Sequence, residues 1–113
     1  MNYLTIICLA VLTACGADSG RFGNSIRGKN INEVLNSMGT PDAQVEFILI
    51  MDNIYEYRSD VMHYATAQEK ASKVKVKEYS WKGPLGKQYV WFIKRRGQWT
   101  AVDGLVWNRG VQY

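Results

Sequence analysis

The stretch KVKVKEYSWKGPLGKQYVWFIKRRGQWTAVDGLVW, residues 73–107, decides the fold class. Residues 73–81 alternate lysine with valine at their start, which is the period of a strand with one polar face. Residues 88–95 are rich in the aromatic and β-branched side chains that favour strands, and residues 99–107 continue in the same way. A Gly-Pro-Leu-Gly segment and an Arg-Gly pair separate the three runs as turns. The pattern predicts three consecutive antiparallel strands.

A short helix is expected upstream, over residues 30–39. Asn30 is a suitable N-cap, and Glu33 three residues later completes a variant of the capping box. The apolar positions follow helical spacing at Ile31, Val34, Leu35 and Met38. Gly39 suits a left-handed position after the last turn, and Pro41 prevents the helix from continuing. Both ends of this helix are therefore marked by the sequence.

Between the helix and the strands, residues 45–51 form an apolar run of strand length and residues 54–58 alternate. The Asp-Asn pair between them predicts a hairpin turn. Residues 59–72 fit either a short helix or a long loop. Together these helix and strand signals predict a single α+β domain over residues 30–113. It has two layers, with one or two short helices packed on an antiparallel sheet of three to five strands. The second sheet face is either open or covered by residues 59–72.

The N-terminal residues predict where the protein is located. Residues 3–14 are uncharged, and as a helix they reach roughly 18 Å, too short for a hydrocarbon core of about 30 Å. They have the length of a signal-peptide apolar region. Leu12-Thr13-Ala14-Cys15 looks like a bacterial lipobox. We therefore expect residues 1–14 to be a lipoprotein signal peptide and Cys15 to be lipidated. The alternatives are an ordinary secretory signal or a buried N-terminal strand.

Residues 15–29 hold several glycines and serines without periodicity, so we expect a flexible tether after the lipidated cysteine. By resemblance to Gram-negative lipoproteins, Gly16 after the cysteine favours the outer membrane, facing the periplasm, with surface exposure as an alternative. The mature chain would lose Cys8 with the signal peptide and would carry Cys15 alkylated. It would then fold without a disulfide.

Charge is distributed unevenly along the chain, whose formal net charge is +4. Residues 70–96 carry nine basic side chains and a single acid, Glu78. This suggests an anionic neighbour, such as lipid headgroups, a cell-wall polymer or an acidic protein face, while nucleic acid is not expected for an exported protein. A solvated lysine face is the alternative reading.

Aromatic side chains gather in the last third of the chain, where all four tryptophans lie. One interpretation is that these aromatic side chains pack in the core. The alternative is that some of them lie on the surface beside arginine and form a binding hot spot. The predicted partner-binding residues are Trp91, Trp99, Arg95, Arg96, Lys73, Lys75 and Lys77.

The sequence offers little for catalysis. His63 is the only histidine, and no Gly-x-Ser-x-Gly elbow supports a nucleophile. No glycine-rich phosphate loop is present, and no His, Cys or acid spacing suits a metal. We expect neither an enzyme nor a cofactor or metal site.

Four short motifs carry a resemblance to a known family. They are Ile26-Arg27-Gly28, Val34-Leu35, Met38-Gly39-Thr40-Pro41 and Tyr55-Glu56-Tyr57. Over residues 26–58 the chain resembles the SmpA/OmlA (BamE-like) small outer-membrane lipoproteins. The resemblance implies two helices before the sheet, where the residues alone predict one. It also implies a non-catalytic accessory role in outer-membrane protein assembly, with contacts to partner proteins and anionic lipid.

The sequence thus favours a membrane-anchored lipoprotein that acts by binding an envelope protein, as a scaffold or assembly accessory. One alternative is an inhibitor lipoprotein directed against a cell-wall hydrolase or a competitor's effector. Another is a surface-exclusion lipoprotein.

Overall fold

The computed structural model describes residues 19–50, 58–84 and 86–107. The described elements, in chain order, are α2 (Ser19–Ile26), α3 (Ile31–Met38), β1 (Ala43–Ile48), α4 (Ser59–Tyr64), α5 (Ala67–Ser72), β2 (Lys75–Gly83), β3 (Gly86–Arg95) and β4 (Gln98–Trp107). No helix in these ranges is long and apolar enough to cross a membrane.

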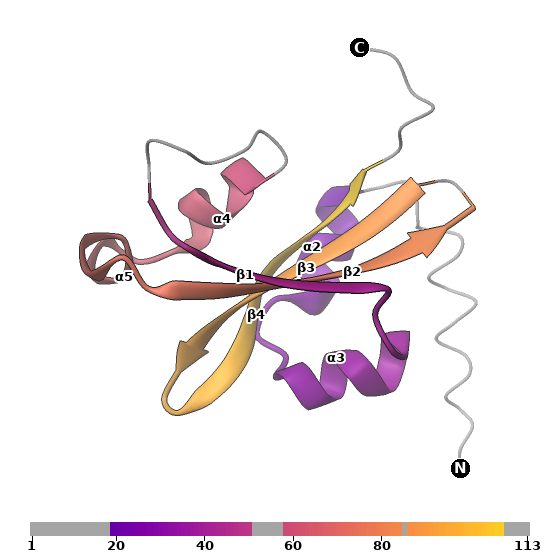
Figure 1. Cartoon of the computed structure of the whole chain (residues 1–113), viewed down its shortest axis with the longest axis horizontal. Helices are drawn as coiled ribbons and strands as arrows, with labels where there is room; N and C mark the ends of the chain where they lie inside the picture. The colour runs from indigo at the N-terminus through magenta and orange to yellow at the C-terminus, as the bar shows by residue number, and fades with distance from the viewer. Residues whose placement is uncertain (1–18, 51–57, 85, 108–113) are drawn as a thin grey trace.

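The four strands form one antiparallel sheet in the order β1-β2-β3-β4 (Figure 1). Strands β2, β3 and β4 are the three consecutive strands predicted from residues 73–107, which the structure confirms. A bulge between Trp91 and Phe92 shifts the register of β3 against β4. The α+β class with an antiparallel sheet is also confirmed.

Helix α3 has the predicted ends. The Asn30 side chain accepts a hydrogen bond from the Glu33 N–H, and the Glu33 carboxylate accepts one from the Asn30 N–H. Gly39 follows the helix as predicted, but its conformation is not the left-handed helical one: φ is 83° and ψ is −168°, an extended region that essentially only glycine occupies. Its carbonyl accepts a hydrogen bond from the Trp81 indole N–H at 3.1 Å, which ties the helix end to the sheet.

Apolar side chains fill both faces of the sheet. On one face, α2 and α3 cover a cluster that includes Tyr79, Val90 and Phe92. On the other, α4 covers a cluster that includes Trp91 and Ile93. Figure 1 shows α3 and α4 on opposite sides of the sheet. Residues 59–72, which the sequence left open between helix and loop, form α4 and α5, and α4 is the cover of the second face.

The predicted tether is wrong from Ser19 onward. Residues 19–26 form α2, which buries Phe22 and Ile26 against the sheet, while residues 15–18 lie outside the described ranges. A Cβ on Gly104 would lie 2.6 Å from Phe22 Cε2, and one on Gly23 would collide with the Asp103 carboxylate. The helix therefore approaches β4 closely because both positions are glycine. In the described part of the chain two helices thus precede β1, the order that the resemblance implied.

The strand pairing described for β1 is not the predicted hairpin of residues 45–51 with residues 54–58. The described partner of β1 is β2, from Ala43 opposite Ser80 to Ile48 opposite Lys75. Residues 51–57 lie outside the described ranges, and Arg58 precedes α4 rather than ending a strand.

The close approach of α2 to β4 makes a test. We expect Gly104→Ala to lower the free energy of unfolding by about 1–3 kcal/mol, because the added methyl displaces the buried Phe22 ring. Gly83→Ala, at a strand position where the added Cβ has only an ordinary contact at 3.4 Å, is the matched control and should change stability far less. Urea unfolding of both variants measures the difference, and equal stabilities would contradict the assigned α2 packing.

Candidate functional site

The structure buries one of the predicted interface residues. The Trp91 side chain has 0% exposure in the cluster beneath α4, and its indole N–H donates to Glu78 Oε1 at 2.9 Å. The prediction that Trp91 binds a partner is therefore wrong. It faces the side of the sheet that residues 59–72 cover, so no partner reaches it in the folded chain.

A buried ion pair reinforces this side of the sheet. Arg58 Nε donates to Glu78 Oε1 at 2.7 Å, and its guanidinium lies 3.9 Å from the centroid of the Phe47 ring. These contacts connect the start of α4 to β1 and β2. Among the described residues, no buried side-chain nitrogen or oxygen lacks a hydrogen-bond partner. The polar atoms of this network are therefore used to hold the fold.

Arg95 also holds local structure, and Arg96 and Lys73 lie at a turn and at a helix end. Arg95 donates to both carboxylate oxygens of Glu69 at 2.7 Å, and this joins β3 to α5. The Arg95 hydrogen bond lowers the pKa of Glu69, and the pairing raises the pKa of Arg95. Arg96 occupies the β3–β4 turn with φ 54°, and Lys73 ends α5 with the same φ. Lys73 therefore precedes β2 and is not part of a lysine row along that strand.

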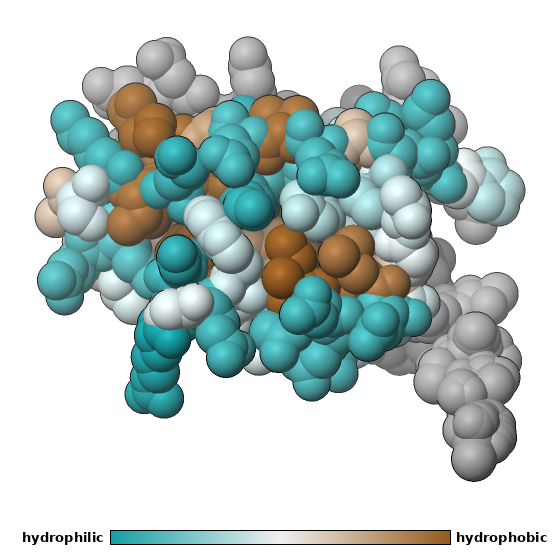
Figure 2. Space-filling model, turned by 60° about the horizontal axis from the view of Figure 1, so that its bottom comes forward, coloured by the Kyte–Doolittle hydropathy of each residue, from teal (hydrophilic) through white to brown (hydrophobic). Residues whose placement is uncertain are grey.

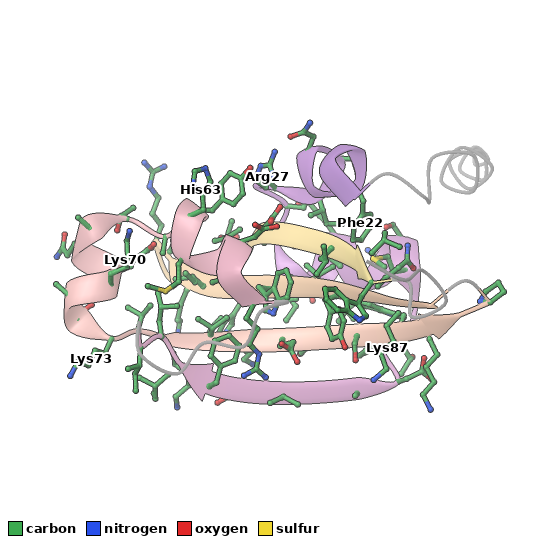
Figure 3. All side chains as sticks on the ribbon, turned by 90° about the horizontal axis from the view of Figure 1, so that it is seen from above. Phe22, Arg27, His63, Lys70, Lys73 and Lys87 are labelled. Atoms are coloured by element: carbon green, nitrogen blue, oxygen red, sulfur yellow. The ribbon has the colours of Figure 1, made fainter. Side chains whose placement is uncertain are left out.

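Lys75, Lys77 and Trp99 are the predicted residues that the structure brings together. Lys77 Nζ lies 4.7 Å from the centroid of the Trp99 ring and 3.9 Å from a Glu46 oxygen. Lys75 Nζ lies 3.7 Å from the other Glu46 oxygen. Because Lys75 and Glu46 are about half exposed and Lys77 is partly exposed, each ion pair contributes little to stability, typically about 0–1 kcal/mol. Figure 3 shows Lys73 and Lys87 at opposite ends of the sheet, well apart from each other.

A second polar cluster lies between α2, α4 and β4. Arg27 donates to Asp103 at 2.7 Å and to Asn24, and its guanidinium lies 4.3 Å from the centroid of the Tyr64 ring. Arg27 and His63 lie close together in Figure 3. Burial raises the pKa of the Asp103 carboxyl, and the charge of Asp60 acts in the same direction. Arg27 thus joins three elements. Within the described ranges, no three His, Cys, Asp or Glu side chains are grouped to hold a metal.

The surface that the sequence did not predict is the edge formed by β1. Its side chains are mostly exposed although four of the six are apolar, and Val45 and Ile48 are 43% and 45% exposed. Ile50, just beyond the strand, is 39% exposed. No other described strand lies beyond β1 in the sheet. Isolated exposed apolar residues are common, but exposed apolar side chains on both faces of an open edge strand, as Val45 and Ile48 are here, favour pairing with another chain.

A shallow groove adjoins this edge where α3 ends. Its volume is about 270 Å³, and it is lined by Leu35, Gly39, Thr40, Pro41, Gln44 and Tyr79. Figure 2 shows a hydrophobic area set among hydrophilic side chains on the side of the molecule where α3 lies. The described lining contains no carboxylate, imidazole or thiol, so it suits contact with apolar and amide groups rather than acid–base chemistry.

Comparison with known proteins adds no relative: no family model, no curated protein and no solved structure matches the chain. The predicted lipidation site, Cys15, lies outside the described residues.

The Glu69–Arg95 pair makes a pH-dependent test. Because the folded-state pKa of Glu69 is lowered, the pair stabilises the fold above the ordinary glutamate pKa and loses this effect as pH falls through the lowered value. We expect Glu69→Gln, which keeps a side chain able to cap α5, to cost about 0.5–1.5 kcal/mol at neutral pH. The cost should shrink in acid.

Glu33→Gln is the control, because Glu33 has the same capping position in α3 and the hydrogen bonds described for it are those of the cap. Thermal unfolding across the acid range measures both variants. A Glu69→Gln cost that does not change with pH would contradict the role of the ion pair.

Proposed function

We propose that this protein is a membrane-anchored, non-catalytic lipoprotein of the bacterial envelope that acts by binding another protein. The observation that carries the proposal is the exposed apolar edge of β1 beside the groove at the end of α3. The rest of the described sheet carries its large apolar side chains inside two clusters. An exposed apolar surface on an otherwise well-packed small domain is the usual mark of an interaction site.

The lipobox gives the anchor in this proposal. Three residues separate Cys15 from the start of α2 at Ser19, and at full extension this connection spans at most roughly 14 Å. A domain held by so short a connection stays at the membrane surface instead of ranging away from it. The partner is then expected to be a membrane-bound protein or one that passes close to the membrane.

The envelope role follows the SmpA/OmlA (BamE-like) resemblance. Among the described elements α2 and α3 precede β1, as the resemblance implied, and α3 ends at the Met-Gly-Thr-Pro motif that carried it. We propose a scaffold or assembly accessory at the outer membrane, facing the periplasm. Neither a cofactor nor a metal has a part in this role.

In-cell photo-crosslinking tests the proposal. With a photoreactive residue in place of Ile48, on the exposed edge, we expect a covalent adduct with an envelope protein, because this side chain lies at the proposed interface. Cys15→Ala should move the chain out of the membrane fraction and reduce the adduct. Immunoblotting and mass spectrometry of the membrane fraction measure both effects.

A photoreactive residue at Gln98, exposed at the β3–β4 turn, is the control position and should give little adduct. Equal adducts from both positions, or none from Ile48, would contradict a binding site at β1. A Cys15→Ala chain that stays processed and membrane-bound would contradict the anchor.

A further inference from the structure

The two edges of the sheet differ in how they are closed. At β4, residues 28–30 run alongside and pair with the strand: Gly28 N–H donates to Ala101 O at 2.8 Å, and Ala101 N–H donates to Lys29 O at 2.8 Å. At β1, the described part of the chain contributes no such cover. Proteins usually protect an open edge with proline, a bulge, charge or a covering segment.

Strand β1 carries almost none of these protections. Its sequence, AQVEFI, contains no proline, glycine or lysine, and its register with β2 is continuous over all six residues. Glu46 is its single charge. An unprotected edge of this kind favours pairing with another strand, so its presence on a small domain needs an occupant.

The main-chain groups available for pairing can be assigned. Leu49 N–H donates to Val74 O at 2.9 Å, one step beyond the pairing of Ile48 with Lys75. Hydrogen-bonding residues alternate along an antiparallel pair. The odd-numbered residues of β1 therefore direct their main-chain groups toward β2. Gln44, Glu46 and Ile48 direct theirs outward.

We propose that β1 pairs with an extended segment of a partner protein, which adds a fifth strand to the sheet; this rests on the proposed function. The segment would carry apolar side chains beside Val45 and Phe47. Opposite Glu46 it would carry a basic or uncharged residue, because an acid there would face a like charge directly.

A second copy of this chain fits the edge poorly. When the outward-facing residues of two antiparallel β1 strands pair about a two-fold axis, at most five residues of each strand overlap. The register centred on Glu46 sets two carboxylates opposite each other, which is a repulsive cross-strand pair, and the register centred on Val45 sets Glu46 opposite Gln44 and leaves Ile48 unpaired. A contact of five residues is also small against the roughly 800 Å² per partner that stable interfaces bury. Charge and size therefore favour a segment of another protein.

A peptide of the expected chemistry provides the test. The probe is fluorescein-labelled Thr-Val-Lys-Val-Thr-Val, which in antiparallel pairing sets lysine opposite Glu46 and valine opposite Val45 and Phe47. Fluorescence anisotropy with the detergent-solubilised full chain measures its dissociation constant. We expect Glu46→Pro to weaken binding by about tenfold or more, since proline removes the outward N–H but no bond to β2.

Glu46→Ala is the matched control and should change the dissociation constant by no more than about threefold, since it keeps the outward N–H. If Glu46→Pro fails to fold, N-methylated peptides test the same hydrogen bonds with the unmutated protein. An N-methyl on the lysine, whose N–H would face β1, should abolish binding. The same group on the central valine, whose N–H would face away, should not.

Several outcomes would overturn strand addition: no binding by the peptide, equal binding by Glu46→Pro and Glu46→Ala, or equal binding by the two methylated peptides. Adducts at Ile48 that join only copies of this chain would overturn the assigned occupant. If peptide binding fails while an envelope protein still crosslinks at Ile48, strand addition is wrong and the proposed function stands. If no protein crosslinks there, the proposed function itself fails.

Discussion

The structure depends on β3 being buried on both of its faces. Val90 and Phe92 point into one apolar cluster, and Trp91 and Ile93 point into the other, all with 0% exposure. A strand of this kind cannot belong to a sheet with one face in water. Cover on both sides is therefore obligatory, and the helices supply it: α2 and α3 on one side, α4 on the other.

This requirement explains how the short helices remain folded. Each has six or eight residues, too short to be stable alone, so its stability must come from packing. The polar contacts have the same purpose. Arg58 joins α4 to Glu78 beneath it, Arg95 joins β3 to α5, and Arg27 joins α2 to Asp103. The arginines therefore hold the cover on the sheet.

The local parts of the fold could be predicted from the sequence. The capping box at Asn30 and the glycine after Met38 mark α3, and the turn glycines separate three runs of β-forming residues. These signals lie within a few residues of the structure that they determine, which explains why they were sufficient.

The remainder depends on contacts between distant residues. Helix α2 has only Phe22 and Ile26 as large apolar side chains, and its fit against β4 requires a glycine on each partner. The glycine content of this segment therefore led to the prediction of a flexible tether. Strand β1 pairs with residues about thirty positions away, and this outweighed a local Asp-Asn turn signal. Trp91 could not be assigned by parity, because both faces of β3 are buried. The open edge itself follows only from the strand order.

Strand β1 is consequently the one strand of the described sheet that lies mostly outside both clusters, and the proposed binding role rests on its outer side being open. Residue-resolved amide hydrogen exchange of the full chain alone tests this most directly. An open edge predicts fast exchange at Gln44, Glu46 and Ile48 and slower exchange at Val45 and Phe47, whose N–H groups face β2. Slow exchange at all five amides, at the level of β3, would mean that the edge is already covered and would contradict the account.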